Sequence, residues 1–161
     1  MKIALITGSC GLVGSESVEF FIRKKFKVIG IDNDLRKFFF GKTASTRWVK
    51  SYLEKKYNKN YKHFNSDITK NEQIEEIFKK YKDKIKVVIH SAAQPSHDWA
   101  ASNPKLDFNV NAIGTLNMLS LTKKYLSKNT AFIYMSTNKV YGDNPNKLKM
   151  KKNKLRFELA K

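Results

Sequence analysis

Three glycines near the amino terminus have the spacing of a phosphate-binding loop. Gly8, Gly11 and Gly14 stand in the segment Thr-Gly-Ser-Cys-Gly-Leu-Val-Gly, which follows the apolar run 3–6. The run predicts a buried strand and the residues after it predict a helix, the context in which such glycines bind a dinucleotide. The first permits a tight turn, the second lets the backbone approach a pyrophosphate, and the third allows close packing of helix on sheet. A glycine-rich turn without a ligand is the alternative.

An acidic residue at the end of the next apolar segment supports the same site. Asp32 closes the predicted strand 27–32 and stands 18 residues after Gly14. A carboxylate about 20 residues beyond the glycines can accept hydrogen bonds from both ribose hydroxyls and repels a 2′-phosphate. We therefore predict NAD rather than NADP, although Arg36 nearby could accommodate the additional phosphate. The alternative is that Asp32 is simply a turn residue at the end of a strand.

Strand and helix patterns alternate along the chain, which predicts a parallel sheet covered on both faces. The predicted strands are 2–6, 27–32, 61–65, 85–90 and 130–136, and the predicted helices are 12–26, 44–57, 71–81 and 104–126. The fold class is α/β, a doubly wound parallel sheet (Rossmann fold), incomplete, with about five strands. We expect residues 33–43 to form a loop whose three phenylalanines, 38–40, pack against the domain or a partner. Thr43 is the expected cap of the following helix.

The net charge of +18 invites a nucleic-acid interpretation, but the residue types argue against it. Of the 32 basic residues only four are arginine, the side chain that phosphates and base edges favour. The lysines are spread along predicted helices and loops, which indicates a solvated surface. We therefore expect no nucleic-acid partner, with a basic polyanion-binding module as an alternative.

Length and cysteine usage bound the class of protein. A chain of 161 residues, 41% of them hydrophobic, is long enough for one folded domain. It has no apolar run of about 18 residues, so we expect no membrane segment. Cys10 is the only cysteine, and no other metal-ligating residue types cluster with it in the sequence. We therefore expect no disulfide, no metal site and a cytoplasmic location. We interpret its side chain as a small filler of the glycine loop, with a reactive thiol as the alternative.

Three further segments, together with the glycine loop, carry a resemblance to a known family. They are His-Ser-Ala-Ala-Gln-Pro-Ser-His-Asp-Trp at 90–99, Asn-Val-Asn-Ala-Ile-Gly-Thr-Leu at 109–116 and Ser-Thr-Asn-Lys-Val-Tyr-Gly-Asp at 136–143. Over nearly its whole length the chain resembles the extended short-chain dehydrogenase/reductase (NAD-dependent epimerase/dehydratase) family, and the third segment is most similar to CDP-paratose 2-epimerases. The resemblance implies transient oxidation of a nucleotide-sugar hydroxyl, most simply of a CDP-sugar, and return of hydride to the opposite face. It also implies a full-length protein that is a homodimer or larger.

The resemblance implies roles for individual residues. Asp67 and Ile68 would contact adenine, and Asn111 would brace the active-site loops through backbone hydrogen bonds, unless it is a surface helix residue. Thr137 would take the catalytic Ser/Thr position beside the sugar oxygen that changes between alcohol and ketone. The residues expected around the cofactor are Gly8, Cys10, Gly11, Leu12, Val13, Gly14, Asp32, Asn33, Asp67, Ile68, Ala92, Ala93 and Asn111. Those expected around the substrate are Gln94, Ser96, His97, Ser136, Asn138 and Lys139, with Trp99 at the substrate access.

One part of the family's chemistry has no counterpart at the expected place. The Tyr-x-x-x-Lys motif should follow Thr137 by some 25 residues or more, whereas the only match, from Tyr52 to Lys56, lies between the second and third predicted strands. We therefore predict an NAD-binding domain over residues 1–142. Residues 143–161 would begin a loop toward a catalytic helix and a substrate domain, and the chain alone would be inactive. A dehydratase or reductase of the same family and a non-catalytic NAD-binding module are the alternatives; Asn138 and Lys139, where a dehydratase usually carries an acid, favour the epimerase.

Overall fold

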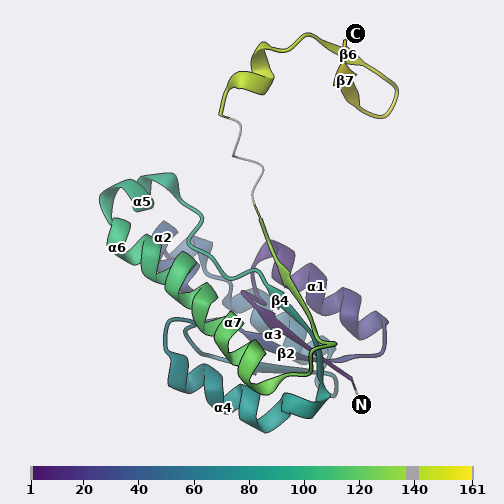
Figure 1. Ribbon diagram of the computed structural model, residues 1–161, viewed down its shortest axis with the longest axis vertical. Coiled ribbons are helices and arrows are strands. Elements are labelled where there is room, and N and C mark those ends of the chain that lie inside the picture. Colours follow the sequence, from purple (N-terminus) through teal and green to yellow (C-terminus); the bar gives the residue numbers. More distant parts are fainter. Residues whose placement is uncertain (1, 137–141, 161) are drawn as a thin grey trace.

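Five parallel strands form the sheet of this protein. The computed structural model describes residues 2–136 and 142–160. The strands are β1 (Ile3–Thr7), β2 (Lys27–Ile31), β3 (Tyr61–Phe64), β4 (Ile85–His90) and β5 (Ala131–Tyr134). Their order in the sheet is β3-β2-β1-β4-β5, and every neighbouring pair is parallel (Figure 1). This order is that of the Rossmann fold, which confirms the predicted fold class.

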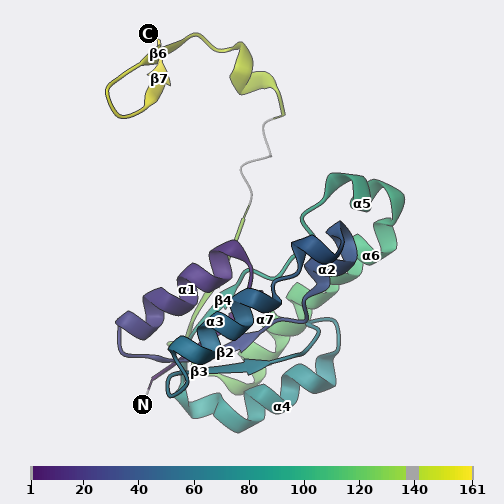
Figure 2. The ribbon, with the colours of Figure 1, turned by 180° about the vertical axis from the view of Figure 1, so that it is seen from behind.

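Helices cover both faces of the sheet. One face carries α1 (Leu12–Arg23) and α3 (Arg47–Lys56), and the other carries α4 (Asn71–Tyr81) and α7 (Gly114–Tyr125), as Figures 1 and 2 show. The shorter helical elements are α2 (Leu35–Phe40), η1 (Lys42–Ala44), η2 (Lys82–Lys84), α5 (His97–Ser102), α6 (Pro104–Phe108), η3 (Asn109–Ile113) and η4 (Asn144–Lys147). Right-handed crossovers keep successive helices on one side of a parallel sheet while the strand order runs in one direction, and they place the next helices on the other side once the order reverses.

The central strand β1 divides the core into two apolar clusters. All five of its residues are buried, as a strand covered on both faces requires. Ile3 and Leu5 belong to the cluster under α4 and α7, with the fully buried Phe78. Ala4 and Ile6 face α1 and α3 and belong to the other cluster. The period of two along β1 therefore supplies apolar side chains to both faces of the sheet.

Helix α1 ends at Arg23, three residues before its predicted end. Lys25 takes the left-handed conformation with φ 63°, and its N–H donates to the Ile22 carbonyl. The N–H of Phe26 donates to the Phe21 carbonyl, and the two rings pack edge to face with centroids 5.3 Å apart. This is a Schellman motif with its apolar contact. The sequence prediction overshot because lysine, rather than glycine, occupies the left-handed position.

The prediction of a loop over residues 33–43 was wrong, since α2 and η1 lie there. The prediction of Thr43 as a helix cap was also wrong, because α3 begins at Arg47 and Thr46 precedes it. Phe39 is buried, as expected of a residue packed against the domain, whereas Phe38 is 61% exposed. Single-sequence patterns missed α2 because its six residues are too few to show a helical period.

Residues 104–125 form one continuous helical stretch with a change of winding in the middle. The predicted helix 104–126 is present as α6, η3 and α7, and η3 is a π-helical segment. Segments of this kind mark functional positions in many proteins because they re-aim the side chains of one turn. Asn111, the expected brace, lies within it.

The carboxy-terminal part contains the antiparallel hairpin of β6 (Met150–Lys152) and β7 (Phe157–Leu159). It lies apart from the five-stranded sheet in both views (Figures 1 and 2). The domain boundary at residue 142 stays a prediction. Within residues 2–136 and 142–160, no helix combines the length and apolar character needed to cross a membrane.

Gly30 in β2 provides a test of how rigid the packing beside the glycine loop is. A Cβ at this position would lie 2.5 Å from the Tyr61 hydroxyl oxygen and 2.6 Å from Ser9 Oγ. We expect Gly30→Ala to lower the free energy of unfolding by about 1–3 kcal/mol in urea denaturation, the range for overpacking. Lys27→Ala, at the exposed start of the same strand, should change it by less than about 0.5 kcal/mol. Equal stability of Gly30→Ala and the wild type would contradict the rigid packing of Tyr61 and Ser9.

Candidate functional site

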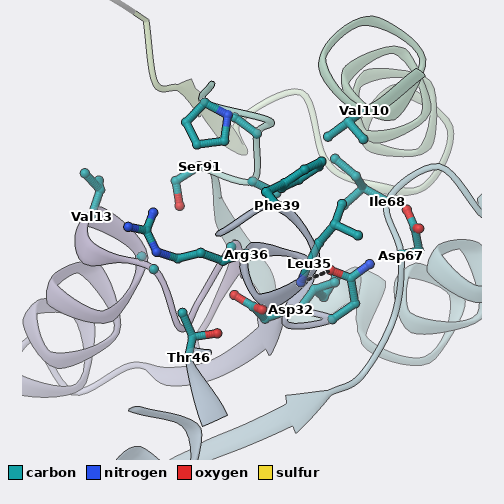
Figure 3. A pocket seen from close by; sticks show the side chains of 18 of the residues that line it. Val13, Asp32, Leu35, Arg36, Phe39, Thr46, Asp67, Ile68, Ser91 and Val110 are labelled. Atoms are coloured by element: carbon teal, nitrogen blue, oxygen red, sulfur yellow. Dashed lines mark hydrogen bonds between the residues drawn. The ribbon is translucent and has the colours of Figure 1, made fainter. Parts of the chain in front are cut away.

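A cavity of about 260 Å³ opens at the carboxyl ends of the strands. Its walls come from the glycine loop, the end of β2, helix α2, the turn after β3 and the loop after β4 (Figure 3). Ligands of open α/β sheets bind at this edge, where the strand order reverses. Eleven of the predicted cofactor residues line this one cavity: Gly8, Gly11, Leu12, Val13, Gly14, Asp32, Asn33, Asp67, Ile68, Ala92 and Ala93.

The glycine loop leaves no room for a side chain at Gly8 or at Gly14. Gly8 has φ +64°, and a Cβ there would lie 2.8 Å from the Ala92 backbone nitrogen. A Cβ on Gly14 would overlap the carbonyl group of Gly8. The loop therefore folds tightly against both the helix that follows it and the loop after β4.

The amino terminus of α1 faces the cavity without a side-chain cap. Gly11 is the N-cap residue and has no side chain to accept from the first-turn N–H groups. Leu12, Val13 and Gly14 of this first turn line the cavity. Uncapped N–H donors and the positive end of the helix dipole beside a glycine cradle fit a pyrophosphate group.

Asp32 is held in place by the backbone. Its Oδ2 accepts from the Cys10 N–H at 3.0 Å, and its Oδ1 accepts from the Asp34 N–H at 2.8 Å. Each carboxylate oxygen has a second lone pair, so the group can still accept from a ribose diol in the cavity. Arg36 lines the same cavity, and its guanidinium carbon lies 5.0 Å from the centroid of the Phe40 ring.

Cys10 lies outside the main cavity and borders a second, polar one beside Asp32 and Asn33. Burial, together with the negative charge of Asp32, raises the pKa of its thiol to about 11. The thiol is therefore protonated at neutral pH and a poor nucleophile. This favours the interpretation of Cys10 as a filler of the loop over that of a reactive thiol.

Asn111 connects the helices to the loop after β4. Its Oδ1 accepts from the Gln94 N–H at 2.9 Å, and its Nδ2 donates to the Gln94 carbonyl at 3.1 Å. The same amide group donates to Asp107 at 2.9 Å. These are the backbone hydrogen bonds expected of a brace. Asn111 itself does not line the cavity, whereas its neighbour Val110 does.

The predicted substrate residues are only partly brought together. Gln94 is buried, and its side-chain amide donates to the Ser96 carbonyl at 2.9 Å and to Asp107 at 2.8 Å. Ser96 caps α5, and His97 is exposed at the start of that helix. Ser136 is exposed beyond β5, and Thr137, Asn138 and Lys139 lie outside the described residues. The roles of all six toward a substrate, and of Thr137 in catalysis, stay predictions.

Sequence reasoning missed a hydrogen-bond relay through His90 at the end of β4. The hydroxyl of Thr115 donates to the Asn111 carbonyl at 2.7 Å, so His90 Nε2, 3.0 Å away, must donate to Thr115 Oγ1. His90 Nδ1 then accepts from the Thr7 hydroxyl at 2.7 Å, and Thr7 Oγ1 accepts from the Ala92 N–H at 3.2 Å. Every group is satisfied only with a neutral imidazole. A polar residue closing the apolar run 85–90 was the available signal.

Burial lowers the pKa of His90 to about 4. The relay joins the start of the glycine loop to the π-helical segment, and it does so without an ion pair. Thr7, Ser91 and Ala92 meet at this point, because the Ser91 hydroxyl also donates to the Thr7 carbonyl at 2.6 Å. Ser91 and Ala92, which line the cavity, are thus held by neutral hydrogen bonds that join β1, β4 and the helix.

Comparison with known proteins places the chain in a family. A sequence model of the family described as GDP-mannose 4,6 dehydratase matches residues 5–156. The chain belongs to this family. It is 36% identical over 143 residues to CDP-paratose 2-epimerase of Salmonella typhi, covering 89% of the chain and 38% of that protein. It is 31% identical over 153 residues to dTDP-glucose 4,6-dehydratase of Salmonella typhimurium, covering 90% of the chain and 39% of that enzyme.

Solved structures of epimerases share the fold. The UDP-glucose 4-epimerase of Bifidobacterium longum in complex with NAD⁺ and UDP superposes with a TM-score of 0.71 at 25% identity, covering 88% of this chain and 38% of that one. The Thermus thermophilus UDP-glucose 4-epimerase complexed with NAD gives 0.60 at 28% identity, over 76% and 34% of the two chains. The predicted resemblance to nucleotide-sugar epimerases and dehydratases is confirmed. The chain spans about two fifths of the length of these curated family members.

The neutral state of His90 predicts a pH dependence of stability. Its pKa is about 4 in the folded protein and 6.5 ordinarily, so the unfolded chain binds the additional proton between these values. The free energy of unfolding should therefore fall as the pH drops from about 6.5 to 4, by up to about 3 kcal/mol from this residue. Urea denaturation across this range should show a shallower slope for His90→Gln than for the wild type.

His63 must be separated from this effect, since burial lowers its pKa as well. The comparison is therefore between slopes, because His63 contributes equally to the wild type and to His90→Gln. The exposed His97 supplies a matched control, and His97→Gln should keep the wild-type slope. Identical slopes for His90→Gln and the wild type would show that His90 is not held neutral.

Proposed function

We propose that this chain is the NAD-binding part of a nucleotide-sugar epimerase similar to CDP-paratose 2-epimerase. The observation that carries the proposal is that three glycines of the loop, the uncapped start of α1 and the backbone-held Asp32 line one cavity. The Salmonella typhi relative supports the choice of subgroup. The epimerase complexes with NAD and NAD⁺ support the choice of cofactor.

Different residues of the chain would bind different parts of the cofactor. The first-turn N–H groups of α1 would bind the pyrophosphate, and Asp32 would accept from the adenosine ribose hydroxyls. Asp67 and Ile68 would border adenine, with Asp67 fixed by the hydrogen bonds that its Oδ1 accepts from the N–H and hydroxyl of Thr69, both at 2.8 Å. The small Ala92 and Ala93 would leave room for the middle of the dinucleotide.

Bound NAD would supply a hydride acceptor that takes hydride from a sugar carbon and returns it to the opposite face. The hydroxyl of Thr137 would hydrogen-bond the reacting sugar oxygen, and Ser136, Asn138 and Lys139 would flank it. The substrate would be a nucleotide sugar, most simply a CDP-sugar. A full-length protein of this kind would be a homodimer or larger.

A dehydratase of the same family is the second candidate. The family description and the 31% identical dTDP-glucose 4,6-dehydratase favour it. The residues after Thr137 argue for the epimerase, because Asn138 and Lys139 supply no carboxyl group beside the hydroxyl. Elimination of water needs an acid to protonate the leaving hydroxyl.

Calorimetric titration of the purified chain with NAD tests the cofactor site. We expect binding, and weaker binding of NADP, because Asp32 repels a 2′-phosphate. Gly11→Val should weaken NAD binding at least about tenfold, since its side chain would fill the space above the loop where the pyrophosphate approaches. Ser120→Val, on the exposed face of α7, is the matched control and should bind as the wild type does. Unchanged affinity in folded Gly11→Val would contradict the assignment of the pyrophosphate to this loop.

Turnover tests the part of the proposal that concerns catalysis. The sequence supplies no Tyr-x-x-x-Lys after Thr137, so no side chain at the family's position can take the alcohol proton. We expect no conversion of CDP-paratose when NAD and the purified chain are incubated with it and the sugars are separated by chromatography. Formation of the 2-epimer would show that another group of this chain acts as the base.

A further inference from the structure

Helix α2 forms one wall of the cavity, yet it is too short to be stable alone. It supplies Leu35, Arg36 and Phe39 to the lining and has six residues. An isolated helix of this length does not persist in water, because nucleation costs more than its few hydrogen bonds return. Contacts from elsewhere must therefore hold this wall in place.

The base of α2 is fastened by Asp34, the residue before the helix. Its carboxylate accepts from the Ser45 hydroxyl and from the Thr46 N–H, each at 2.7 Å. Arg47 adds an ion pair at 3.5 Å. These bonds join the residues that flank the segment 35–44. The carboxyl end of α2, which lies within this segment, is held by other residues.

The far end of α2 is fastened by Trp99 of α5. The indole Nε1–H donates to the Phe39 carbonyl at 2.8 Å. This carbonyl belongs to the last turn of α2, where no helical N–H follows to bond it. The indole also packs on two rings of α2, with centroids 5.3 Å from Phe38 and 5.5 Å from Phe39. Figures 1 and 2 both place α2 beside α5.

Trp99 is itself held from the opposite wall of the cavity. Its N–H donates to the Ser96 hydroxyl at 3.3 Å, and Ser96 is bound by Gln94. Gln94 is in turn held by Asn111. The chain of contacts therefore runs from the π-helical segment through the loop after β4 to the wall that follows β2. It joins the two walls that lie on either side of the central strand.

We infer that Trp99 is a positioning residue of the cofactor site, which holds α2 so that Arg36 and Phe39 border the adenosine half of the dinucleotide. The inference rests on the proposed binding of NAD. Phe39 is 7% exposed and lies near Ile68 and Val110 in the cavity, with Arg36 and Asp32 on its other side (Figure 3). Loosening α2 would therefore affect the adenosine end of the site first.

The chain has two tryptophans, which makes the experiment selective. Trp99→Phe keeps an aromatic ring and removes the N–H donor. Trp48→Phe is the matched control, because Trp48 on α3 is 73% exposed and does not line the cavity. Calorimetry with NAD and with ADP-ribose should show about three- to tenfold weaker binding of both by Trp99→Phe, the loss expected for one hydrogen bond. Trp48→Phe should bind as the wild type does.

Two further measurements separate positioning from general stability. The denaturation midpoint of Trp99→Phe, followed by circular dichroism, should stay close to that of Trp48→Phe, because α2 lies outside the two core clusters apart from its edge contacts. In Trp48→Phe, where Trp99 is the sole tryptophan, saturation with NAD should reduce acrylamide quenching of its fluorescence. This second measurement decides the question even if Trp99→Phe does not fold.

Each result has a defined meaning. Wild-type affinity in folded Trp99→Phe, or quenching that NAD does not change, would overturn the role of Trp99 while leaving the proposed cofactor intact. Weaker binding together with an equally lowered midpoint would show a structural role only and would also overturn it. Failure of the wild-type chain to bind NAD would overturn the proposed function and, with it, this inference.

Discussion

The contact between the glycine loop and the loop after β4 is the constraint on which the site depends. Gly8 approaches Ala92 so closely that a single Cβ would lie 2.8 Å from the Ala92 nitrogen. This closeness brings Thr7 within hydrogen-bond reach of His90 and of Ala92. It also lets α1 begin directly at the sheet edge, with its N–H groups toward the cavity. A larger residue at Gly8 would separate the two loops and so disrupt the glycine loop that faces the cavity.

Neutral hydrogen bonds hold the loop after β4 against β1 and the helix, whereas the Asp34 carboxylate and its ion pair with Arg47 fasten helix α2. The relay through His90 and the amide network of Gln94 and Asn111 both end on the π-helical segment. The ion pairs Arg23–Glu19 and Lys50–Glu54 lie away from the cavity at the surface, where such pairs contribute little to stability. The charged side chains that line the cavity are Asp32, Asp67 and Arg36, so these and the helix dipole control where a charged ligand lies.

Much of the fold and of the glycine loop could be predicted from local patterns. Four of the five strands were visible as apolar runs, and the parallel arrangement of all five followed from the alternation with helices. The glycines and Asp32 were visible because strand, turn and helix dictate their spacing. Helix α2, the end of α1 and the start of α3 were not predictable in the same way. Each is set by a few hydrogen bonds, such as those of Asp34 and Lys25, which leave no periodic signal.

The sequence by itself determined the sheet, the position of the dinucleotide loop and the acid that faces it, because these depend on residues close together in the chain. Only the tertiary structure decided the state of His90, whose Nδ1 partner Thr7 is 83 residues away. It alone decided that Trp99 packs on helix α2, with its indole donating to the carbonyl of Phe39, 60 residues distant. Hydrogen-bond partners and desolvation come from whatever folding brings alongside a residue, and one sequence does not reveal such neighbours.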